Sequence, residues 1–223
     1  DMISSLIDKD GHITVKGFYD DVVELSAEDR AKLSRAPFDL EEYKEFLDIK
    51  EVKGEAGYTS LERTGIRPCL DVNGIWGGYI GEGAKTVLPS VAHAKISMRL
   101  VPNQDSETIT RLFEEHFKAI APDYVKVEVT PHHGGNGFLI PISSPAYKAA
   151  EKAMTEVYGI EPVPSRGGGS IPILADLQRI LEIDPLLMGF GLERDTIHSP
   201  NESYLLKQLF AGMEAIALFY RYY

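Results

Sequence analysis

The chain has 223 residues, which is enough for one large domain or two smaller ones. Its content of 43% hydrophobic and 26% charged residues is ordinary for a globular protein, and its net charge of -11 argues against nucleic acid or an anionic membrane as a partner, because both attract basic patches. The single cysteine, Cys69, excludes an internal disulfide and fits a cytoplasmic protein. The sequence contains neither a signal-peptide pattern nor an apolar run of about 20 residues that could span a membrane.

The start of the chain resembles the last turns of a helix, over residues 1–7, which a turn sequence then stops. A chain that opens inside a helix suggests a segment of a longer protein. Residues 12–18 alternate and predict a short strand or an extended loop. The next expected elements are a helix beginning near Ser26, a charged helix over 39–52 and a polar loop over 54–65.

Two long strands are predicted next, over residues 68–79 and 86–101, with a glycine-containing turn between them. An amphipathic helix over 105–120 and an alternating strand over 124–129 follow. One further strand in front would complete a ferredoxin-like βαββαβ pattern, which is an α+β arrangement. The Gly-, Pro- and Ser-rich stretch 131–145 indicates a domain boundary, so the first domain is expected to span residues 1–138.

The second expected domain, residues 139–223, has an α/β pattern. It comprises a helix over 145–158, a Gly-rich loop over 165–172, a helix over 173–181, a short buried strand over 186–190 and a closing helix over 202–222. One strand and three helices cannot cover both faces of a sheet, so the pattern indicates only part of an α/β domain.

Three local patterns are candidate binding features. The glycines that follow Arg166 precede a helix and could seat an anion on backbone N–H groups, or form a plain tight turn. His198 follows the predicted buried strand, where α/β sites form, and could bind zinc, or be satisfied within a turn. Arg99 on the polar face of a strand could bind a carboxylate in a bidentate manner, or make a surface salt bridge.

Five segments together resemble a family of zinc exopeptidases that includes carnosinase-like dipeptidases, aminoacylases, carboxypeptidase G and succinyl-diaminopimelate desuccinylase. They are NGIWGGY at 73–79, KTVLP at 85–89, SMRLVP at 97–102, RGGGSIP at 166–172 and HSPNE at 198–202. Each segment alone is only a weak indication of the family. Together, their order and spacing over nearly the whole chain resemble the family closely. The dipeptidase branch fits best, because its long insert resembles GFYDDV at 17–22.

The resemblance implies a ferredoxin-like lid that also forms a homodimer, followed by the C-terminal part of an α/β zinc-peptidase catalytic domain. It implies that His198 binds the second of two zinc ions, with Mn or Co as possible substitutes. It further implies a seat for the carboxylate of a short peptide or acyl amino acid, formed by Gly168, Gly169 and Ser170. Arg99 resembles the lid arginine that clamps this carboxylate, and Thr86 resembles a lid residue that reaches the partner subunit's active site.

Departures from the family pattern limit what this chain is expected to do. The other zinc ligands, the general-base Glu and the lid His of the family lie upstream of the matching region, and Gly167 replaces a Glu that many dipeptidases have. We therefore expect a peptidase fragment that holds no catalytic residue and is inactive alone. The alternative is a dimerisation or binding module without chemistry.

Overall fold

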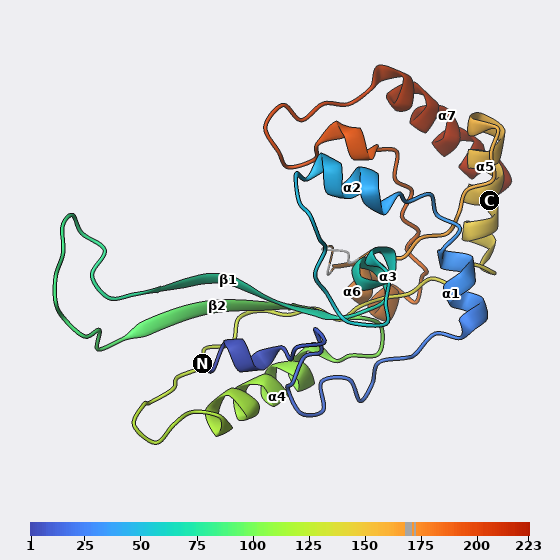
Figure 1. The fold of residues 1–223 in the computed structure, drawn as a ribbon. Coiled ribbons are helices and arrows are strands. Elements are labelled where there is room, and N and C mark those ends of the chain that lie inside the picture. The colour runs from blue at the N-terminus through green and yellow to red at the C-terminus, as the bar shows by residue number, and fades with distance from the viewer. Residues whose placement is uncertain (168–170, 172) are drawn as a thin grey trace. The chain divides into compact units, whose positions relative to one another are not determined.

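A computed structural model describes residues 1–167, 171 and 173–223. The chain forms two compact units (Figure 1). The first unit comprises Asp1–Gly137 together with Arg166–Pro172, and the second comprises Phe138–Ser165 together with Ile173–Tyr223.

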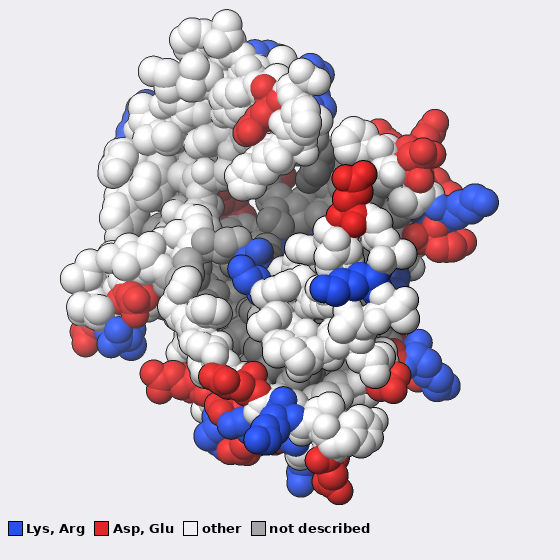
Figure 2. Space-filling model, turned by 90° about the vertical axis from the view of Figure 1, so that its left-hand side faces the viewer, with Lys and Arg blue, Asp and Glu red and all other residues white. Residues whose placement is uncertain are grey.

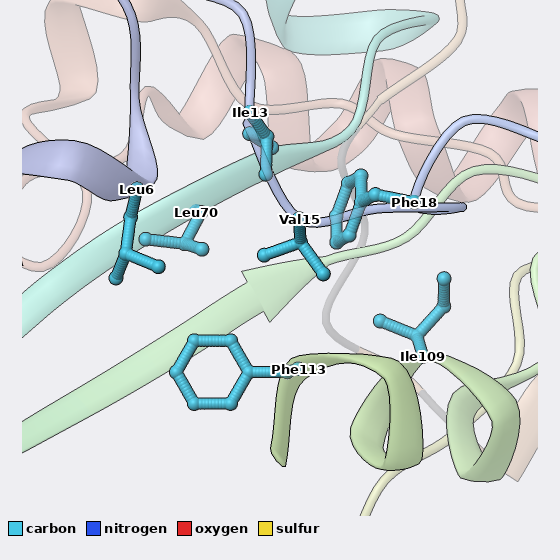
Figure 3. Close-up of a cluster of buried hydrophobic side chains, with 7 residues drawn as sticks. All are labelled: Leu6, Ile13, Val15, Phe18, Leu70, Ile109 and Phe113. Atoms are coloured by element: carbon cyan, nitrogen blue, oxygen red, sulfur yellow. The ribbon is translucent and has the colours of Figure 1, made fainter. Parts of the chain in front are cut away.

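The first unit has a hydrophobic core built by segments from four parts of its sequence. A 3-10 turn, η1 (Ser4–Leu6), leads into an isolated antiparallel bridge between Ile7 and Ile13. Residues 12–18 are therefore an extended loop rather than a strand of a sheet. Figure 3 shows the cluster that these segments form with the hairpin and a helix; its members are Leu6, Ile13, Val15, Phe18, Leu70, Ile109 and Phe113.

A two-stranded antiparallel sheet runs through this unit. Strand β1 (Cys69–Gly77) pairs with β2 (Ala92–Arg99), and Cys69 lies opposite Arg99. Both predicted strands are confirmed, although each is shorter than expected. The base of the hairpin is anchored because Leu70 is buried in the core, whereas the distal part is exposed, as Ile75 is 65% exposed.

The helices of the first unit are α1 (Ala27–Leu33), α2 (Leu40–Phe46), α3 (Ser60–Gly65) and α4 (Ser106–Ala119). The predicted starts of α1 and α4 are confirmed, since Ser26 and Asp105 accept hydrogen bonds from backbone N–H groups of the first turn. The helix expected over 39–52 ends at Phe46. The loop expected over 54–65 is wrong in its second half, where Thr59 and the third helical residue form a capping box for α3.

The strand expected over 124–129 is wrong. The described residues form one two-stranded sheet, and this segment has no strand partner in it. Alternation alone could not reveal this, because a strand requires a neighbouring strand to take its backbone hydrogen bonds. Of the ferredoxin-like pattern, β1, β2 and α4 are therefore formed.

The second unit is helical in the part of the chain that the structure describes. Its elements are α5 (Pro145–Tyr158), α6 (Ile173–Leu181), the 3-10 turn η2 (Glu193–Asp195) and α7 (Leu206–Tyr222). The predicted bounds of α5 and α6 are confirmed. Ser144 caps α5 and Pro145 occupies its first turn, which suits a residue without an N–H group.

Small residues, rather than the large apolar ones, form the packed side of the helix pair α5 and α7. The buried residues of the two helices are Ala149, Ala150, Ala153, Gly212 and Ala215. The large apolar side chains of α7 are instead mostly open, since Leu206 and Met213 are 68% and 59% exposed. The predicted start of this helix at residue 202 is also four residues early.

The buried strand expected over 186–190 is wrong. These residues are extended without a strand partner, and Leu187 is 56% exposed. Phe190 lies against Gly212 of α7, where an added Cβ atom would stand 3.0 Å from the ring. The apolar run is therefore partly covered by a helix, but within the described residues it is not part of a sheet.

Charged side chains of both signs lie side by side on the face of the molecule in Figure 2. Ion pairs one helical turn apart include Arg111 with Glu115 and Lys32 with Glu28. Among the residues described, no helix is both long and apolar enough to cross a membrane.

Candidate functional site

Arg99 is the last residue of β2 and lies at the base of the hairpin. Its side chain is exposed, as are those of Lys95 and Ser97, whereas Ile96 and Met98 pack against the core. The predicted polar and apolar faces of this strand are thus confirmed. Thr86 lies in the exposed connection between β1 and β2, outside the strand that was expected to contain it.

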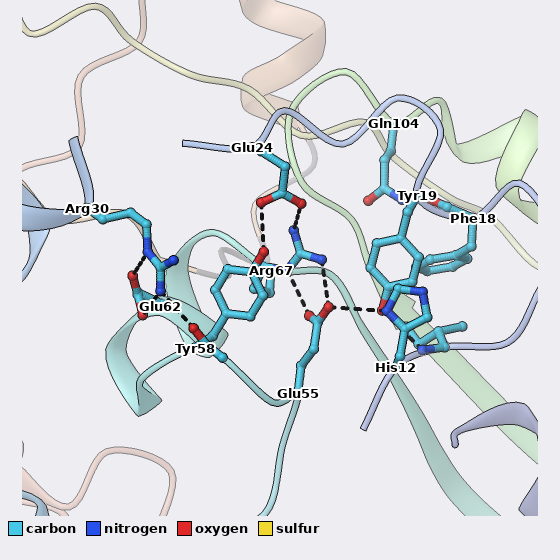
Figure 4. A network of polar contacts seen from close by, with 12 residues as sticks. His12, Phe18, Tyr19, Glu24, Arg30, Glu55, Tyr58, Glu62, Arg67 and Gln104 are labelled. Carbon is cyan, nitrogen blue, oxygen red and sulfur yellow. Dashed lines mark hydrogen bonds and ion pairs between the residues drawn. The ribbon is translucent and has the colours of Figure 1, made fainter. Parts of the chain in front are cut away.

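A buried guanidinium fixes the chain just before β1 (Figure 4). The side chain of Arg67 is 5% exposed. It donates two hydrogen bonds of 2.7 Å to the carboxylate of Glu55 and one of 2.7 Å to Glu24. The rings of Tyr58 and Tyr19 lie 4.3 and 5.1 Å from its guanidinium carbon. A cation held by two carboxylates and two rings is well compensated for its burial.

The pKa values in this network follow from the same contacts. Glu24 accepts a hydrogen bond from the Tyr58 hydroxyl, and this bond together with Arg67 lowers its pKa. Burial, and then the bond to Glu24, raises the pKa of Tyr58 to about 12. Against the effect of burial, Glu55 and Glu24 raise the pKa of Arg67. Glu24 and Arg67 are therefore charged and Tyr58 is neutral at pH 7, so these side chains anchor the chain and do not exchange protons at this pH.

A second ion pair stabilises the adjoining helix α3. The guanidinium of Arg30 binds both oxygens of Glu62, whose carboxylate also accepts the backbone N–H of Thr59 at 2.7 Å. These bonds, the one from Arg30 first, lower the pKa of Glu62 to about 2. The two networks hold the segment from Glu55 to Arg67, and hence the base of the hairpin where Arg99 lies.

The Gly-rich segment begins against α3. A Cβ atom added to Gly65 would stand 2.3 Å from the carbonyl oxygen of Arg166, so only glycine permits this approach. Gly168, Gly169 and Ser170, the predicted carboxylate seat, lie outside the residues that the structure describes.

His198 lies in the loop between η2 and α7, with its side chain exposed and its φ at 63°. Its backbone N–H donates to the carboxylate of Glu202 at 3.2 Å. The loop is closed at its ends by the N–H of Ser203, which donates to the carbonyl of Asp195 at 3.0 Å. The imidazole is thus presented on a loop with its own hydrogen bonds, in the second unit, whereas Arg99 and Thr86 belong to the first.

A metal site is not complete among the residues that the structure describes, since no group of three His, Cys, Asp or Glu side chains could hold an ion. His198 is suited to supply one ligand, because its imidazole is accessible. Two features were missed by sequence reasoning: the Arg67 network and the buried Asp195. Neither has a local sequence signal, because each depends on contacts that only the fold creates.

Comparison with known protein families matches residues 10–222 to Peptidase family M20/M25/M40. The chain therefore belongs to this family of peptidases.

Among curated proteins, the chain is 32% identical to the Cys-Gly metallodipeptidase DUG1 of Saccharomyces cerevisiae, over 100% of this chain and 47% of that protein. It is 30% identical to the human Beta-Ala-His dipeptidase, over 98% of this chain and 44% of that protein. Among solved structures, an M20 family metallo-carboxypeptidase of Sulfolobus solfataricus superposes with a TM-score of 0.84 at 30% identity, over 98% of this chain and 50% of that one. The chain thus spans about half the length of the relatives it matches.

Proposed function

We propose that this chain forms part of a metallodipeptidase and supplies its substrate clamp and one metal ligand. The observation that carries the proposal is the family match over residues 10–222, together with relatives named as Cys-Gly and Beta-Ala-His dipeptidases. The substrates would be short peptides with a free terminal carboxylate, or N-acyl amino acids. The bond cleaved would be the amide bond next to that terminal residue.

The two parts of the chain would have different tasks. Residues 1–138 would form the ferredoxin-like lid and the homodimer contact, and residues 139–223 would form the C-terminal part of the catalytic domain. The exposed distal part of the hairpin supports a contact role for the lid, because exposed apolar side chains such as Ile80 and Leu88, 90% and 92% exposed, favour association.

Within this scheme the chain's residues would bind and orient the substrate. The Arg99 guanidinium would bind the terminal carboxylate through two parallel hydrogen bonds. Backbone N–H groups of Gly168 and Gly169 and the hydroxyl of Ser170 would seat the same carboxylate. Thr86 would contact the substrate bound to the partner subunit. Fixing one end of a short peptide in this way places its amide bond at a defined position, which accelerates the reaction by orientation.

His198 would be a ligand of the second of two zinc ions, with Mn or Co as alternatives. An imidazole on a loop fits a zinc ligand. When bound, such a metal lowers the pKa of a coordinated water and polarises the scissile carbonyl. Since catalytic zinc sites use about three protein ligands and the described residues hold no such group, we expect the chain alone to be inactive.

The test is complementation. The 223-residue chain is assayed for hydrolysis of Cys-Gly and β-Ala-His with Zn²⁺, Mn²⁺ or Co²⁺, alone and co-expressed with the half of the yeast dipeptidase that the match leaves uncovered. We expect no turnover alone and turnover on co-expression. His198→Ala should abolish this turnover and Arg99→Ala should raise KM, whereas the control His132→Ala, at an exposed position outside the hairpin, should change neither. Turnover that survives His198→Ala would refute the proposal.

A second candidate is a dimerisation or binding module without chemistry, which the exposed hairpin also favours. Co-expression distinguishes the two. A stable complex of the two polypeptides that cleaves no dipeptide would favour the binding module.

A further inference from the structure

Asp195 has an unusual environment for a carboxylate. The residue is 2% exposed, and its Oδ1 atom is buried without a hydrogen-bond partner among the residues that the structure describes. Its other oxygen, Oδ2, accepts the backbone N–H of Leu192 at 2.8 Å. Thus one carboxylate oxygen of Asp195 has a hydrogen-bond partner and the other has none among the described residues. Asp195 lies three residues before His198.

A buried carboxylate oxygen without a hydrogen-bond donor destabilises the folded chain. Buried polar atoms in native proteins almost always have a partner, so an exception calls for an explanation. The remainder of Asp195 is fully engaged: its backbone N–H donates to Leu192 at 2.9 Å, and its carbonyl accepts from Ser203 at 3.0 Å. The residue therefore closes the loop on both sides and leaves one acceptor unused.

The loop that Asp195 closes is conformationally strained. Thr196, His198 and Asn201 all have positive φ values, of 50°, 63° and 64°. This backbone conformation is unfavourable for a residue other than glycine. Strain of this kind persists only where other contacts enforce it, and one such contact is the hydrogen bond from the Ser203 N–H to the Asp195 carbonyl.

We propose that Asp195 is the positioning residue of His198: its carboxylate closes the loop around residues 192–203, and its free Oδ1 accepts one ring N–H of the His198 imidazole. The other ring nitrogen is then held with its lone pair outward, as a metal ligand requires. This inference rests on the proposed role of His198. A carboxylate that fixes the tautomer and orientation of a ligating imidazole is a recurrent arrangement in metal sites.

The separation along the chain permits this bond. Three residues span at most about 11 Å, and the closed loop shortens the distance further. The nearby Thr196 hydroxyl is not available, because it donates to the carbonyl of Asn201. The exposed ring of His198 can turn about its two side-chain torsions, which is a motion of picoseconds to nanoseconds.

The experiment measures the tautomer of His198 by long-range ¹H–¹⁵N correlation NMR, on the full chain, without metal and with a chelator present. The test variant is Asp195→Asn, which keeps an oxygen for the Leu192 N–H but replaces the free acceptor by an N–H₂ donor. Asp184→Asn is the matched control: the same chemical change in the same unit, at an exposed side chain that contacts Gln178.

In the wild-type chain we expect one neutral tautomer of His198 to dominate, in contrast to the exposed His133. Asp195→Asn should change the ratio of the two tautomers by about tenfold, the effect of replacing one hydrogen-bond acceptor by a donor. The amide signals of Leu192 and Ser203 should remain in place, and Asp184→Asn should have no effect.

Two results would overturn the inference. One is a wild-type tautomer ratio at His198 equal to that at His133, which decides the matter even if the variant misfolds. The other is an unchanged ratio in Asp195→Asn. Because metal and substrate are absent, neither result depends on whether the chain takes part in dipeptide hydrolysis, which the complementation assay tests separately.

Discussion

The ion pair between Arg30 and Glu62 provides a quantitative test of how α3 is held. Folding lowers the pKa of Glu62 from 4.5 to about 2. A difference of this size corresponds to about 3 kcal/mol of folding stability at neutral pH. Since the side chain of Arg30 is 38% exposed, screening by solvent reduces the contribution to about 2 kcal/mol. Glu62→Gln should therefore destabilise the first unit by about this amount at pH 7.

The sign of the pH dependence follows from the direction of the shift. A carboxylate whose pKa is lowered by folding contributes its full stabilisation above the unfolded pKa, here 4.5, and loses it as the pH falls through the folded value of about 2. The difference in stability between Glu62→Gln and the wild type should accordingly shrink between about pH 4.5 and pH 2. The amide acceptor of Gln keeps the contact with Thr59, so the variant removes the charge and retains the helix cap.

Urea titrations followed on NMR signals of α4 and β1 measure the unfolding of this unit alone. The control is Glu115→Gln, which removes the charge of an exposed pair with Arg111 and should cost at most about 0.5 kcal/mol. If Glu62→Gln costs no more than Glu115→Gln, or if the difference persists unchanged at pH 2, the assignment of this stability to the buried carboxylate is wrong.

Two further predictions concern Gly65, at the end of α3, and Cys69, at the start of β1. Gly65→Ala should destabilise the first unit by about 1–3 kcal/mol in the same titration, because its Cβ atom would overlap the carbonyl of Arg166, whereas Gly189→Ala, with open space around it, should not. Burial, and then the bond to Asp71, raises the pKa of Cys69 to about 11, so its thiol should react with a disulfide reagent at pH 8 about a hundredfold more slowly than a thiol of pKa 9.0. Asp71→Asn should accelerate that reaction, and a wild-type rate typical of an exposed thiol would contradict the prediction.

The elements that sequence reasoning predicted correctly are those with local causes. α4 and α5 are capped by Asp105 and Ser144, whose side chains accept hydrogen bonds from backbone N–H groups of the first turn. Donor and acceptor of such a cap lie within four residues of each other in the sequence. The strand over 186–190 failed for the opposite reason. An apolar run can become a strand only where another strand pairs with it, and no local pattern states whether one does.

The residues of the candidate site likewise separate into those with a local sequence signal and those whose contacts are distant along the chain. The alternation that placed Arg99 on a polar strand face is local, and the structure has this face exposed. The burial of Arg67 between Glu24 and Glu55 is not local, because these residues are separated by 43 and 12 positions along the chain. Sequence motifs could identify residues that would contact a ligand, but not the buried charges that hold them.

The exposed apolar side chains of α7 give a physical reason why a site of this kind would need further polypeptide in addition to the residues that bind the ligand. The helix is packed on its small residues, Gly212 and Ala215, while Leu206 and Met213 remain largely exposed. Burying a side chain of that size stabilises a fold by about 1.5–3 kcal/mol. The loop of His198 is attached to this helix and carries the strain of three positive φ values. A polypeptide that covered α7 would therefore stabilise the helix that follows the His198 loop in the chain. Binding of a substrate or a metal at His198 would in turn depend on that cover.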